Sequence, residues 1–380
     1  MSETSRLFIM AGGGTGGHVF PMVAVAMELE KRGHSILFVG ARRGMEARLV
    51  PAAGYPIEFV DIGGLKRVGV FRAIRTLGQL PRAILRMCFL LRRRRPAAIF
   101  SLGGYAAGPV AAAALLTGTA IVLMEPNAVP GFSNRIVGRW AARALLNWPE
   151  SERYFRREKA EVTGLPIRPE FFQIQPRTPD GSLNVVIIGG SRGSRTLNRA
   201  AAASWPRFRR TGLPIRFLHQ CGPEAYEDFS REFAAAGVDG KVVAFIEDMP
   251  AAVAEADLVI CRAGAGTVSE LAAAGRPAIL TPFPYAADDH QTRNAEIFAG
   301  AGAAILVPDR EMTGQRLFEE VSSLARRKEA IDSMAKAARS LARPGAAARA
   351  ADILEEIART HIDTGRESRK NKTESLNNVL

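Results

Sequence analysis

The stretch LFIMAGGGTGGHVFP, residues 7–21, joins a short apolar run to a glycine-rich turn, and a helical pattern follows to about Arg32. An apolar run of this length indicates a buried strand, and the glycines after it let the backbone turn tightly into the helix. The N–H groups of the turn and of the helix N-terminus can bind an anion. The stretch therefore predicts a strand–loop–helix unit of an α/β fold with an anion site where the strand ends.

Similar units recur along the chain in two series. The first series continues with apolar runs at residues 35–40, 99–102 and 120–123, and the second comprises runs at 183–188, 215–219, 242–245, 258–261 and 278–281. Strands that alternate with helical patterns predict parallel sheets flanked by helices. Because 380 residues exceed one ordinary domain, we expect two Rossmann-like domains with a deep cleft between them.

The segment TGLPIRPE, residues 163–170, carries a glycine and two prolines and is typical of a hinge. We therefore place the domains at residues 1–163 and 164–344. The polar segment 360–380 has few large apolar residues, and we expect it to be a disordered tail.

Composition narrows the class of protein. The three cysteines lie far apart without CxxC spacing, which indicates neither a disulfide framework nor a cysteine zinc site. No signal peptide is visible at the N-terminus. Residues 107–124 are uncharged and long enough to span a bilayer, but Gly118 interrupts them, so we expect a buried helix followed by a strand. The net charge of +13 indicates an anionic partner.

The first glycine loop allows more than one interpretation. Gly12, Gly14 and Gly17 satisfy GxGxxG, which is typical of dinucleotide sites, but arginines rather than an acidic residue follow the second strand at positions 42 and 43. A phosphorylated cofactor, or a tight turn without a ligand, remains an alternative. His18 ends the loop and could accept a proton from an attacking hydroxyl, or it could merely bond the backbone.

Three further motifs indicate a nucleotide site. GGSRGS (189–194) repeats the glycine loop with a hydroxyl and a cation, and CRAGAGTVSE (261–270) places glycines before a helix start. Glu270 could accept both hydroxyls of a ribose, or it could act as a helix-capping residue. DDHQTRN (288–294) offers amide and imidazole groups to sugar hydroxyls, or it is a solvated loop. No Asp-x-Asp motif follows a strand, so we expect no metal and no cofactor, and arginines and helix dipoles must stabilise the leaving group.

Taken together, GGGTGGHVFP (12–21), the 125–127 loop, GGSRGS, CRAGAGTVSE and DDHQTRNA (288–295) resemble the MurG family of peptidoglycan enzymes over about residues 6–355. The resemblance implies the GT-B architecture, with a last helix at about 345–359 returning to the first domain. It also implies an inverting transfer of N-acetylglucosamine from UDP-N-acetylglucosamine to lipid I, which forms lipid II for the cell wall at the cytoplasmic face of the membrane.

The resemblance also assigns roles to individual residues, with His18 as the catalytic base. The donor-binding residues that it implies are Thr15, Gly16, Gly17, Asn127, Arg168, Ser191, Ile246, Ala265, Gly266, Thr267, Val268, Ser269, Glu270, His290 and Gln291. The candidates on the acceptor or phosphate side are Gly12, Gly13, Gly14 and Glu125. The chain departs from the family pattern at Met124 and Pro126, which leaves open the path of that loop and an acceptor contact by its first residue.

Residues 66–95 interleave apolar side chains with arginines and end in the run at 92–95. Such a basic amphipathic segment is typical of proteins that bind an anionic membrane surface. A helix pair with a solvated basic rim is the alternative, and nucleic acid is not an expected partner because no recognition module is visible. Alternative functions are another GT-B glycolipid transferase, a UDP-N-acetylglucosamine 2-epimerase, a nicotinamide-dependent oxidoreductase and a membrane-binding module.

Overall fold

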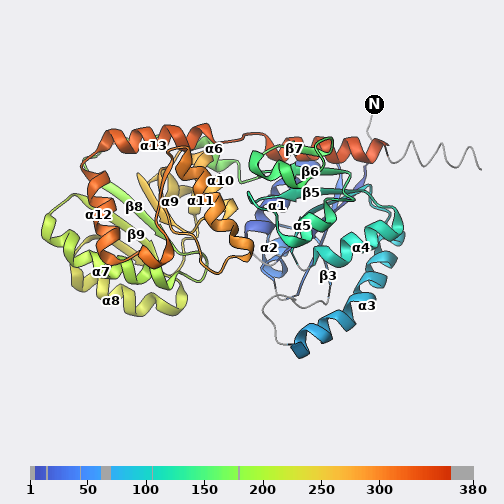
Figure 1. Ribbon diagram of the computed structural model, residues 1–380, viewed down its shortest axis with the longest axis horizontal. Coiled ribbons are helices and arrows are strands. Elements are labelled where there is room, and N and C mark those ends of the chain that lie inside the picture. The colour runs from blue at the N-terminus through green and yellow to red at the C-terminus, as the bar shows by residue number, and fades with distance from the viewer. Residues whose placement is uncertain are drawn as a thin grey trace, which may run out of the picture. The chain divides into compact units, whose positions relative to one another are not determined.

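The computed structural model of the chain describes residues 5–13, 16–42, 44–60, 70–104, 106–178 and 180–360, without the side chains of residues 16 and 70–78. The chain forms two compact units (Figure 1). Unit 1 comprises Met1–Ile167 and Gly345–Leu380, and unit 2 comprises Arg168–Pro344. The chain thus leaves unit 1 once and returns to it at its end.

Unit 1 contains a parallel sheet of seven strands in the order β3-β2-β1-β4-β5-β6-β7. The strands are β1 Leu7–Gly12, β2 Ser35–Gly40, β3 Ile57–Phe59, β4 Ala98–Gly103, β5 Ile121–Glu125, β6 Arg143–Leu146 and β7 Ala160–Val162. The helices are α1 Gly16–Lys31, α2 Glu46–Ala52, α3 Val70–Arg94, α4 Ala107–Thr117 and α5 Phe132–Val137, with a 3₁₀ turn at Pro149–Tyr154 and a last helix over residues 346–360.

Unit 2 contains a parallel sheet of six strands in the order β10-β9-β8-β11-β12-β13. The strands are β8 Leu183–Ile188, β9 Ile215–Gln220, β10 Asp239–Val243, β11 Leu258–Cys261, β12 Ala278–Leu280 and β13 Ala304–Leu306. The helices are α6 Glu170–Gln173, α7 Arg195–Thr211, α8 Tyr226–Ala236, α9 Met249–Ala254, α10 Ala265–Ala274, α11 His290–Gly300, α12 Gly314–Ala325 and α13 Lys328–Ser340. Both sheets confirm the α/β class and the GT-B architecture.

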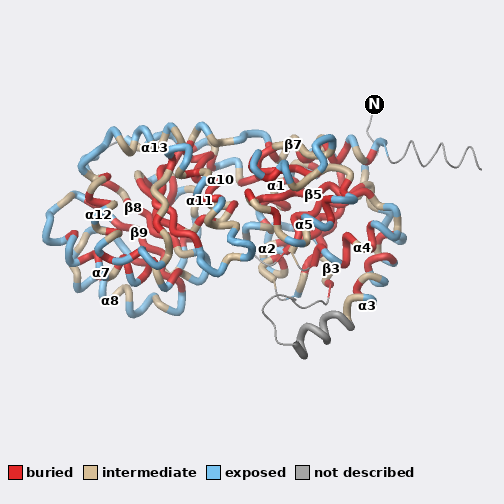
Figure 2. Tube along the Cα trace, viewed as in Figure 1, coloured by how far each residue is buried: buried red, intermediate tan, exposed pale blue. Residues whose placement is uncertain are grey.

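The central strands of both sheets are buried (Figure 2). In unit 1, α3 and α4 cover one face of the sheet, where Met87 and Val110 join a cluster with Ile9 and Ile99. In unit 2, α7 brings Trp205 against the face that carries Phe217, and the edge of Trp205 meets Phe233 at a centroid distance of 5.0 Å. These apolar contacts supply the main driving force that holds each helix on its sheet.

The uncharged segment 107–124 folds as predicted. It forms α4, which ends where Gly118 adopts a left-handed conformation with φ 69°, and then enters β5. A glycine terminates a helix in this conformation without steric cost. Across the described ranges, no helix is both long enough and apolar enough to cross a bilayer.

Several predicted boundaries differ from the structure. The strand expected at 242–245 is wrong, because β10 spans Asp239–Val243 and Phe245 lies exposed in the loop after it. The strands β3, β6, β7 and β13 have no counterpart in the predicted series. All four have three or four residues; β3, β7 and β13 are only partly buried, and β6 begins with an arginine. They therefore lack the continuous apolar run that made the equally short but fully buried β11 and β12 recognisable. The predicted tail lies outside the described residues, apart from Thr360 at the end of the last helix.

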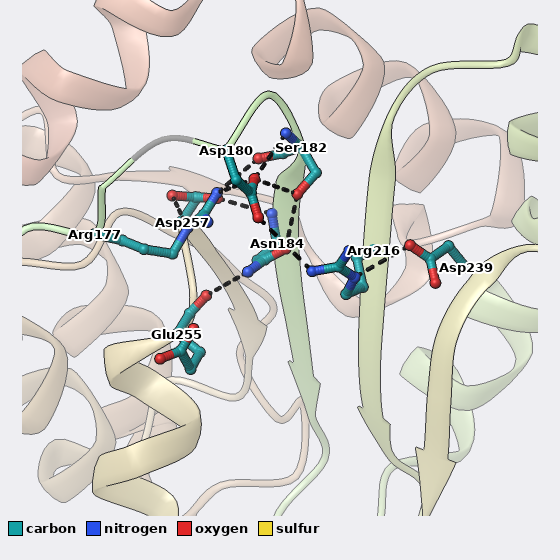
Figure 3. A network of polar contacts seen from close by, with 8 residues as sticks. All are labelled: Arg177, Asp180, Ser182, Asn184, Arg216, Asp239, Glu255 and Asp257. Atoms are coloured by element: carbon teal, nitrogen blue, oxygen red, sulfur yellow. Dashed lines mark hydrogen bonds and ion pairs between the residues drawn. The ribbon is translucent and has the colours of Figure 1, made fainter.

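A polar network joins the amino ends of the strands in unit 2 (Figure 3). The guanidinium of Arg177 donates to both carboxylate oxygens of Asp257, with distances of 2.8 to 3.1 Å, and also to the carbonyl of Ser182 at 2.7 Å. Asp257 accepts in addition from the backbone N–H of Asn184 at 2.8 Å. The network therefore ties the segment that enters unit 2 to the base of β8 and β11.

Candidate functional site

One candidate site is the carboxyl edge of the sheet in unit 1. β1 ends at Gly12, and α1 begins at Gly16; Gly14 and Thr15 lie outside the described residues. Gly104, with φ +85°, lies against this loop, because a Cβ there would stand 2.7 Å from the carbonyl oxygen of Gly13. The loops after β1 and β4 therefore approach each other as closely as backbone allows.

A buried carboxylate supports the glycine loop from behind. Glu46, 1% exposed in the first turn of α2, accepts a hydrogen bond from the backbone N–H of Ala41 at 2.9 Å. Its side chain occupies the space that a Cβ at Gly13, Gly40 or Gly44 would need. The motifs did not reveal Glu46, because its signal is a single glutamate at a helix start.

Two titratable candidates lie near this edge. His18 is in the first turn of α1 and is partly exposed. Glu125 is the last residue of β5 and is completely buried. Its Oε1 accepts from the backbone N–H of Asn127 at 2.9 Å and its Oε2 from Nδ2 of Asn134 at 2.8 Å. Burial raises the pKa of Glu125 to about 7, although these hydrogen bonds oppose the shift.

The loop after β5 has a defined path through Pro126. The carbonyl of Pro126 accepts from Nδ2 of Asn147 at 2.9 Å, and Oδ1 of Asn147 accepts from the N–H of Leu165 at 2.9 Å. Met124 is completely buried within β5. The proline is therefore accommodated, and the Met124 side chain packs in the core of unit 1.

Another candidate site is the carboxyl edge of the sheet in unit 2. Ser191 lies exposed in the loop after β8, and Ser194 caps α7 by accepting from the N–H of Leu197. Gly193 has φ +76° and lies directly against the carbonyl of Cys221, so this loop has no room for a side chain there. Gln220, at the end of β9, bonds to this loop and to Ile246, and sequence reasoning did not single it out.

The start of α10 offers backbone donors to an anion. Gly264 is the N-cap, and the helical hydrogen bonds begin with the N–H of Val268, which donates to the Gly264 carbonyl at 3.0 Å. The N–H groups of residues 265–267 precede this ladder and point outward from the helix N-terminus, where the helix dipole favours negative charge. Val268 itself is completely buried, and Ser269 is buried as well.

Arg168 and Glu270 meet beside this helix start. The guanidinium of Arg168 donates to Oε1 of Glu270 at 3.3 Å and lies over the ring of Phe171, 4.9 Å from its centroid. The Glu270 side chain is 19% exposed, and burial raises its pKa in spite of the arginine. The two residues that were predicted to hold a nucleotide are therefore brought together from positions 102 residues apart.

The loop after β12 is fixed from two sides. Arg262 donates to the carbonyls of Thr281 and Pro282, both at 3.1 Å, and forms an ion pair with Asp309. Oε1 of Gln291 accepts from the N–H of Phe283 at 2.9 Å. The amide NH₂ of Gln291 therefore remains the group that can donate to a sugar hydroxyl.

His290 begins α11, and its Nδ1 lies 2.5 Å from the carbonyl of Ala287. This contact fixes the protonated nitrogen as Nδ1 and leaves Nε2 as an acceptor in the neutral ring. Asp288 and Asp289, directly before it, adopt left-handed conformations with φ 54° and 52°. The predicted sugar contacts thus lie on a sharp turn at a helix N-terminus.

Each unit thus gathers its predicted residues at one edge of its own sheet. Unit 1 gathers Gly12, Gly13, Gly16, Gly17, His18, Glu125 and Asn127, and unit 2 gathers Arg168, Ser191, Ile246, Ala265, Gly266, Thr267, Val268, Ser269, Glu270, His290 and Gln291. Within the described parts of the chain, no group of three or more histidine, cysteine or acidic residues is placed to hold a metal ion. The residues at these two edges can bind anions, recognise hydroxyl groups and transfer protons.

Comparison with known proteins identifies relatives over nearly the whole chain. Residues 8–146 match the glycosyltransferase family 28 N-terminal domain, and residues 184–357 match the glycosyltransferase family 28 C-terminal domain. A protein of Solibacter usitatus named UDP-N-acetylglucosamine--N-acetylmuramyl-(pentapeptide) pyrophosphoryl-undecaprenol N-acetylglucosamine transferase is 54% identical over 359 residues, which cover 94% of this chain and 98% of the relative.

Two solved structures are also similar to this chain over most of its length. The crystal structure of Acinetobacter baumannii MurG is similar with a TM-score of 0.77 and 34% identity, covering 92% of this chain and 99% of that one. The UDP-GlcNAc 2-epimerase of Neisseria meningitidis, at 14% identity, is similar with a TM-score of 0.65 and covers 92% of this chain and 99% of its own. At that identity, the second likeness shows a shared fold alone.

Proposed function

The chain belongs to the MurG family within glycosyltransferase family 28, and from this premise we propose that it transfers N-acetylglucosamine from UDP-N-acetylglucosamine to lipid I. The acceptor is the 4-hydroxyl of the muramyl sugar in undecaprenyl-diphosphate-linked N-acetylmuramyl-pentapeptide, and the product is lipid II. The observation that carries the proposal is the 54% identity over 94% of the chain. The geometry of both sheet edges supports it.

We assign binding of the donor to unit 2, which corresponds to the predicted domain 164–344. The N–H groups at the start of α10 and the loop of Ser191 bind the diphosphate, because a helix N-terminus and glycine loops present aligned donors. Glu270 accepts from the ribose hydroxyls, while Arg168 keeps its carboxylate oriented through their 3.3 Å contact. Ile246 brackets the uracil, and His290 and Gln291 bind the sugar.

We assign binding of the acceptor and of the reacting end of the donor to unit 1, which corresponds to the predicted domain 1–163. The loop of residues 12–17 and Asn127 contact the diphosphate and the transferred sugar, and Glu125 lies on the acceptor side. His18 accepts the proton of the 4-hydroxyl while the oxygen of that hydroxyl bonds to the anomeric carbon of the donor sugar. The bond between this carbon and the diphosphate breaks, and UDP leaves with the electron pair. One displacement inverts the anomeric centre without a covalent enzyme intermediate.

The basic amphipathic segment is assigned to the membrane that holds the acceptor. In the described part of α3, the exposed face carries Leu85 and Phe89 between Arg82, Arg86 and Arg92. Exposed apolar side chains bordered by arginines suit an anionic bilayer surface, where each cation contributes about 1 kcal/mol. We therefore place the enzyme peripherally on the cytoplasmic face of the bacterial membrane, with residues 66–95 as contact and no nucleic acid as partner; residues 61–69 lie outside the described chain.

The test is release of UDP from UDP-N-acetylglucosamine by the purified protein, with and without a lipid I analogue and with no metal added. Release that requires the analogue and yields a β-1,4-linked disaccharide supports the proposal. If UDP binds but the analogue does not react, the acceptor assignment is wrong, and glycolipid acceptors and 2-epimerisation become the reactions to assay.

A further inference from the structure

Gln220 is a buried polar side chain that none of the motifs includes. It is the last residue of β9 and is 1% exposed. Its Nε2 donates to the carbonyl of Gly190 at 2.8 Å, and its Oε1 accepts from the N–H of Ile246 at 2.8 Å. One amide therefore bonds the loop after β8 and the loop after β10 at the same time.

The place of Gln220 in the sheet explains why it can reach both loops. It lies opposite Ile188 at the end of β8 and opposite Val243 at the end of β10. Beyond these residues the strand ladders end, and the chain turns at Gly190, which has φ +91°. The amide both donates and accepts a hydrogen bond here, so an apolar side chain of the same length would leave the carbonyl of Gly190 and the N–H of Ile246 unpaired.

We propose that Gln220 is a positioning residue that fixes the separation of the Ser191 loop and the Ile246 loop, and thereby sets the affinity for a uridine diphosphate. This rests on the proposed function, in which Ser191 holds the phosphates and Ile246 brackets the base. A nucleotide joins its base and its diphosphate through one ribose, so the two loops can bind both ends only at a fixed spacing. Preorganised loops bind more tightly because less ordering is left to occur on binding.

The experiment compares Gln220→Met and Gln220→Glu with the unmodified chain. Methionine keeps the length and loses both hydrogen bonds, while glutamate keeps the acceptor for Ile246 and, when ionised, repels the carbonyl of Gly190. We expect the Kd for UDP and the KM for UDP-N-acetylglucosamine to rise about five- to tenfold or more, with a smaller change in kcat. The affinity of Gln220→Glu relative to the unmodified chain is expected to recover as the pH falls, because a protonated carboxyl can donate to Gly190.

Ser204→Ala is the matched control. Ser204 is completely buried in α7 and donates to the Ala201 carbonyl at 2.6 Å, remote from both loops along the helix. It should lower the thermal stability of unit 2 and leave the Kd for UDP unchanged.

Three results would overturn the proposal. Unchanged affinity for UDP in folded Gln220→Met and Gln220→Glu would leave Gln220 with a purely structural role. An equal loss of affinity in Ser204→Ala would show that general destabilisation explains the effect. If the unmodified chain did not bind UDP, the proposed function would be refuted together with this inference. Failure of the inference alone is recognised by normal UDP binding in the unmodified chain.

Discussion

At the scale of single residues, the carboxyl edge of the sheet in unit 1 presents two titratable groups in opposite environments. His18 is partly exposed, whereas Glu125 is completely buried and has its pKa raised to about 7. A proton acceptor must reach the reacting hydroxyl, and the buried carboxylate is enclosed by Asn127 and Asn134. This contrast favours His18 as the base. Glu125 instead holds the loop that carries Asn127 through the hydrogen bond from the Asn127 N–H.

Replacement of the proposed base provides the first prediction. His18→Ala should lower kcat by about 10² to 10⁴, the range that general-base catalysis contributes. The Kd for UDP should stay unchanged, because His18 itself is assigned no contact with the nucleotide. The measurement is steady-state turnover together with calorimetric titration of UDP. Turnover close to that of the unmodified chain, with normal UDP binding, would exclude His18 as the base.

The pair of Arg168 and Glu270, to which nucleotide binding is assigned, provides the second prediction. Glu270→Ala should weaken UDP binding by about 10- to 100-fold, since hydrogen bonds to a charged group are worth about 1.5 to 3 kcal/mol. Calorimetry measures the change, and Glu227→Ala, on the exposed surface of α8, serves as the control. If the affinity for UDP did not differ between the two variants, Glu270 would serve only its ion pair with Arg168 and would not be a ribose contact.

The third prediction concerns the pH dependence of stability. Burial lowers the pKa of His219 to about 4 from its ordinary 6.5. Its stabilising neutral form is therefore fully favoured above pH 6.5, and stability is lost as the pH falls from there toward 4, by about 3 kcal/mol. His219→Phe keeps the edge contact with Trp205 and removes the titration.

Urea unfolding between pH 7.5 and 4.5 checks the His219 prediction. At pH 7.5 the variant should be less stable by about 1 to 2 kcal/mol, because Oδ1 of Asn198 loses the 3.1 Å contact with His219. The deficit should shrink as the pH falls. A difference in stability that does not change with pH would show that His219 titrates normally in the folded chain.

Sequence predicted the motif residues but not the side chains that position them. The glycine loops and Glu270 carry signals because glycines before a helix have a recognisable spacing. Gln220 and Asn147 bond backbone groups far along the chain, 26 residues away in the bond from the N–H of Ile246 to Gln220. Glu46 bonds the nearby N–H of Ala41, but its side chain also packs against Gly13, which lies far from it in sequence. A single polar residue at the end of a strand has no local pattern, so these contacts become visible only in three dimensions.

At the scale of elements, the predictions succeeded where nearly every residue of a strand is buried. β2, β8 and β11 have the bounds that their apolar runs predict. β10 was misplaced because its first three residues, Asp239, Gly240 and Lys241, are exposed. An edge strand of this kind lacks the apolar run on which the prediction depends.

The fourth prediction tests α3 as a membrane contact. The double variant Leu85→Ser with Phe89→Ser should bind vesicles containing anionic lipid more than about tenfold more weakly, since burying each side chain is worth about 1.5 to 3 kcal/mol. Tyr226→Ser, which removes an exposed aromatic side chain from unit 2, is the control. Vesicle flotation measures binding, and turnover of a short-chain soluble acceptor should be unaffected. Equal flotation of the double variant and the unmodified chain would favour the solvated helix pair instead.

At the scale of the whole molecule, the last helix closes the fold on unit 1. Residues 346–360 return to the sheet that the chain left at Ile167. His34 accepts at Nδ1 from the N–H of Arg6 at 3.4 Å, so its Nε2 carries the hydrogen and donates to Glu355 at 2.9 Å. Arg32 joins the same cluster through Glu355 and Asp352. The helix is therefore held by polar contacts as well as by its apolar face.

The fifth prediction compares two contacts that hold this helix in unit 1. The side chains of His34 and Glu355 are 2% and 10% exposed, whereas those of Arg349 and Glu161 are 40% and 38% exposed. Double-mutant cycles with leucine should give a coupling free energy of about 1 to 3 kcal/mol for the buried pair and below about 1 kcal/mol for the exposed pair, because solvent screens the latter. Amide hydrogen exchange of residues 346–360 reports the local opening directly. A larger coupling for Arg349 and Glu161 would mean that the surface ion pair, and not the buried histidine, fixes the returning helix.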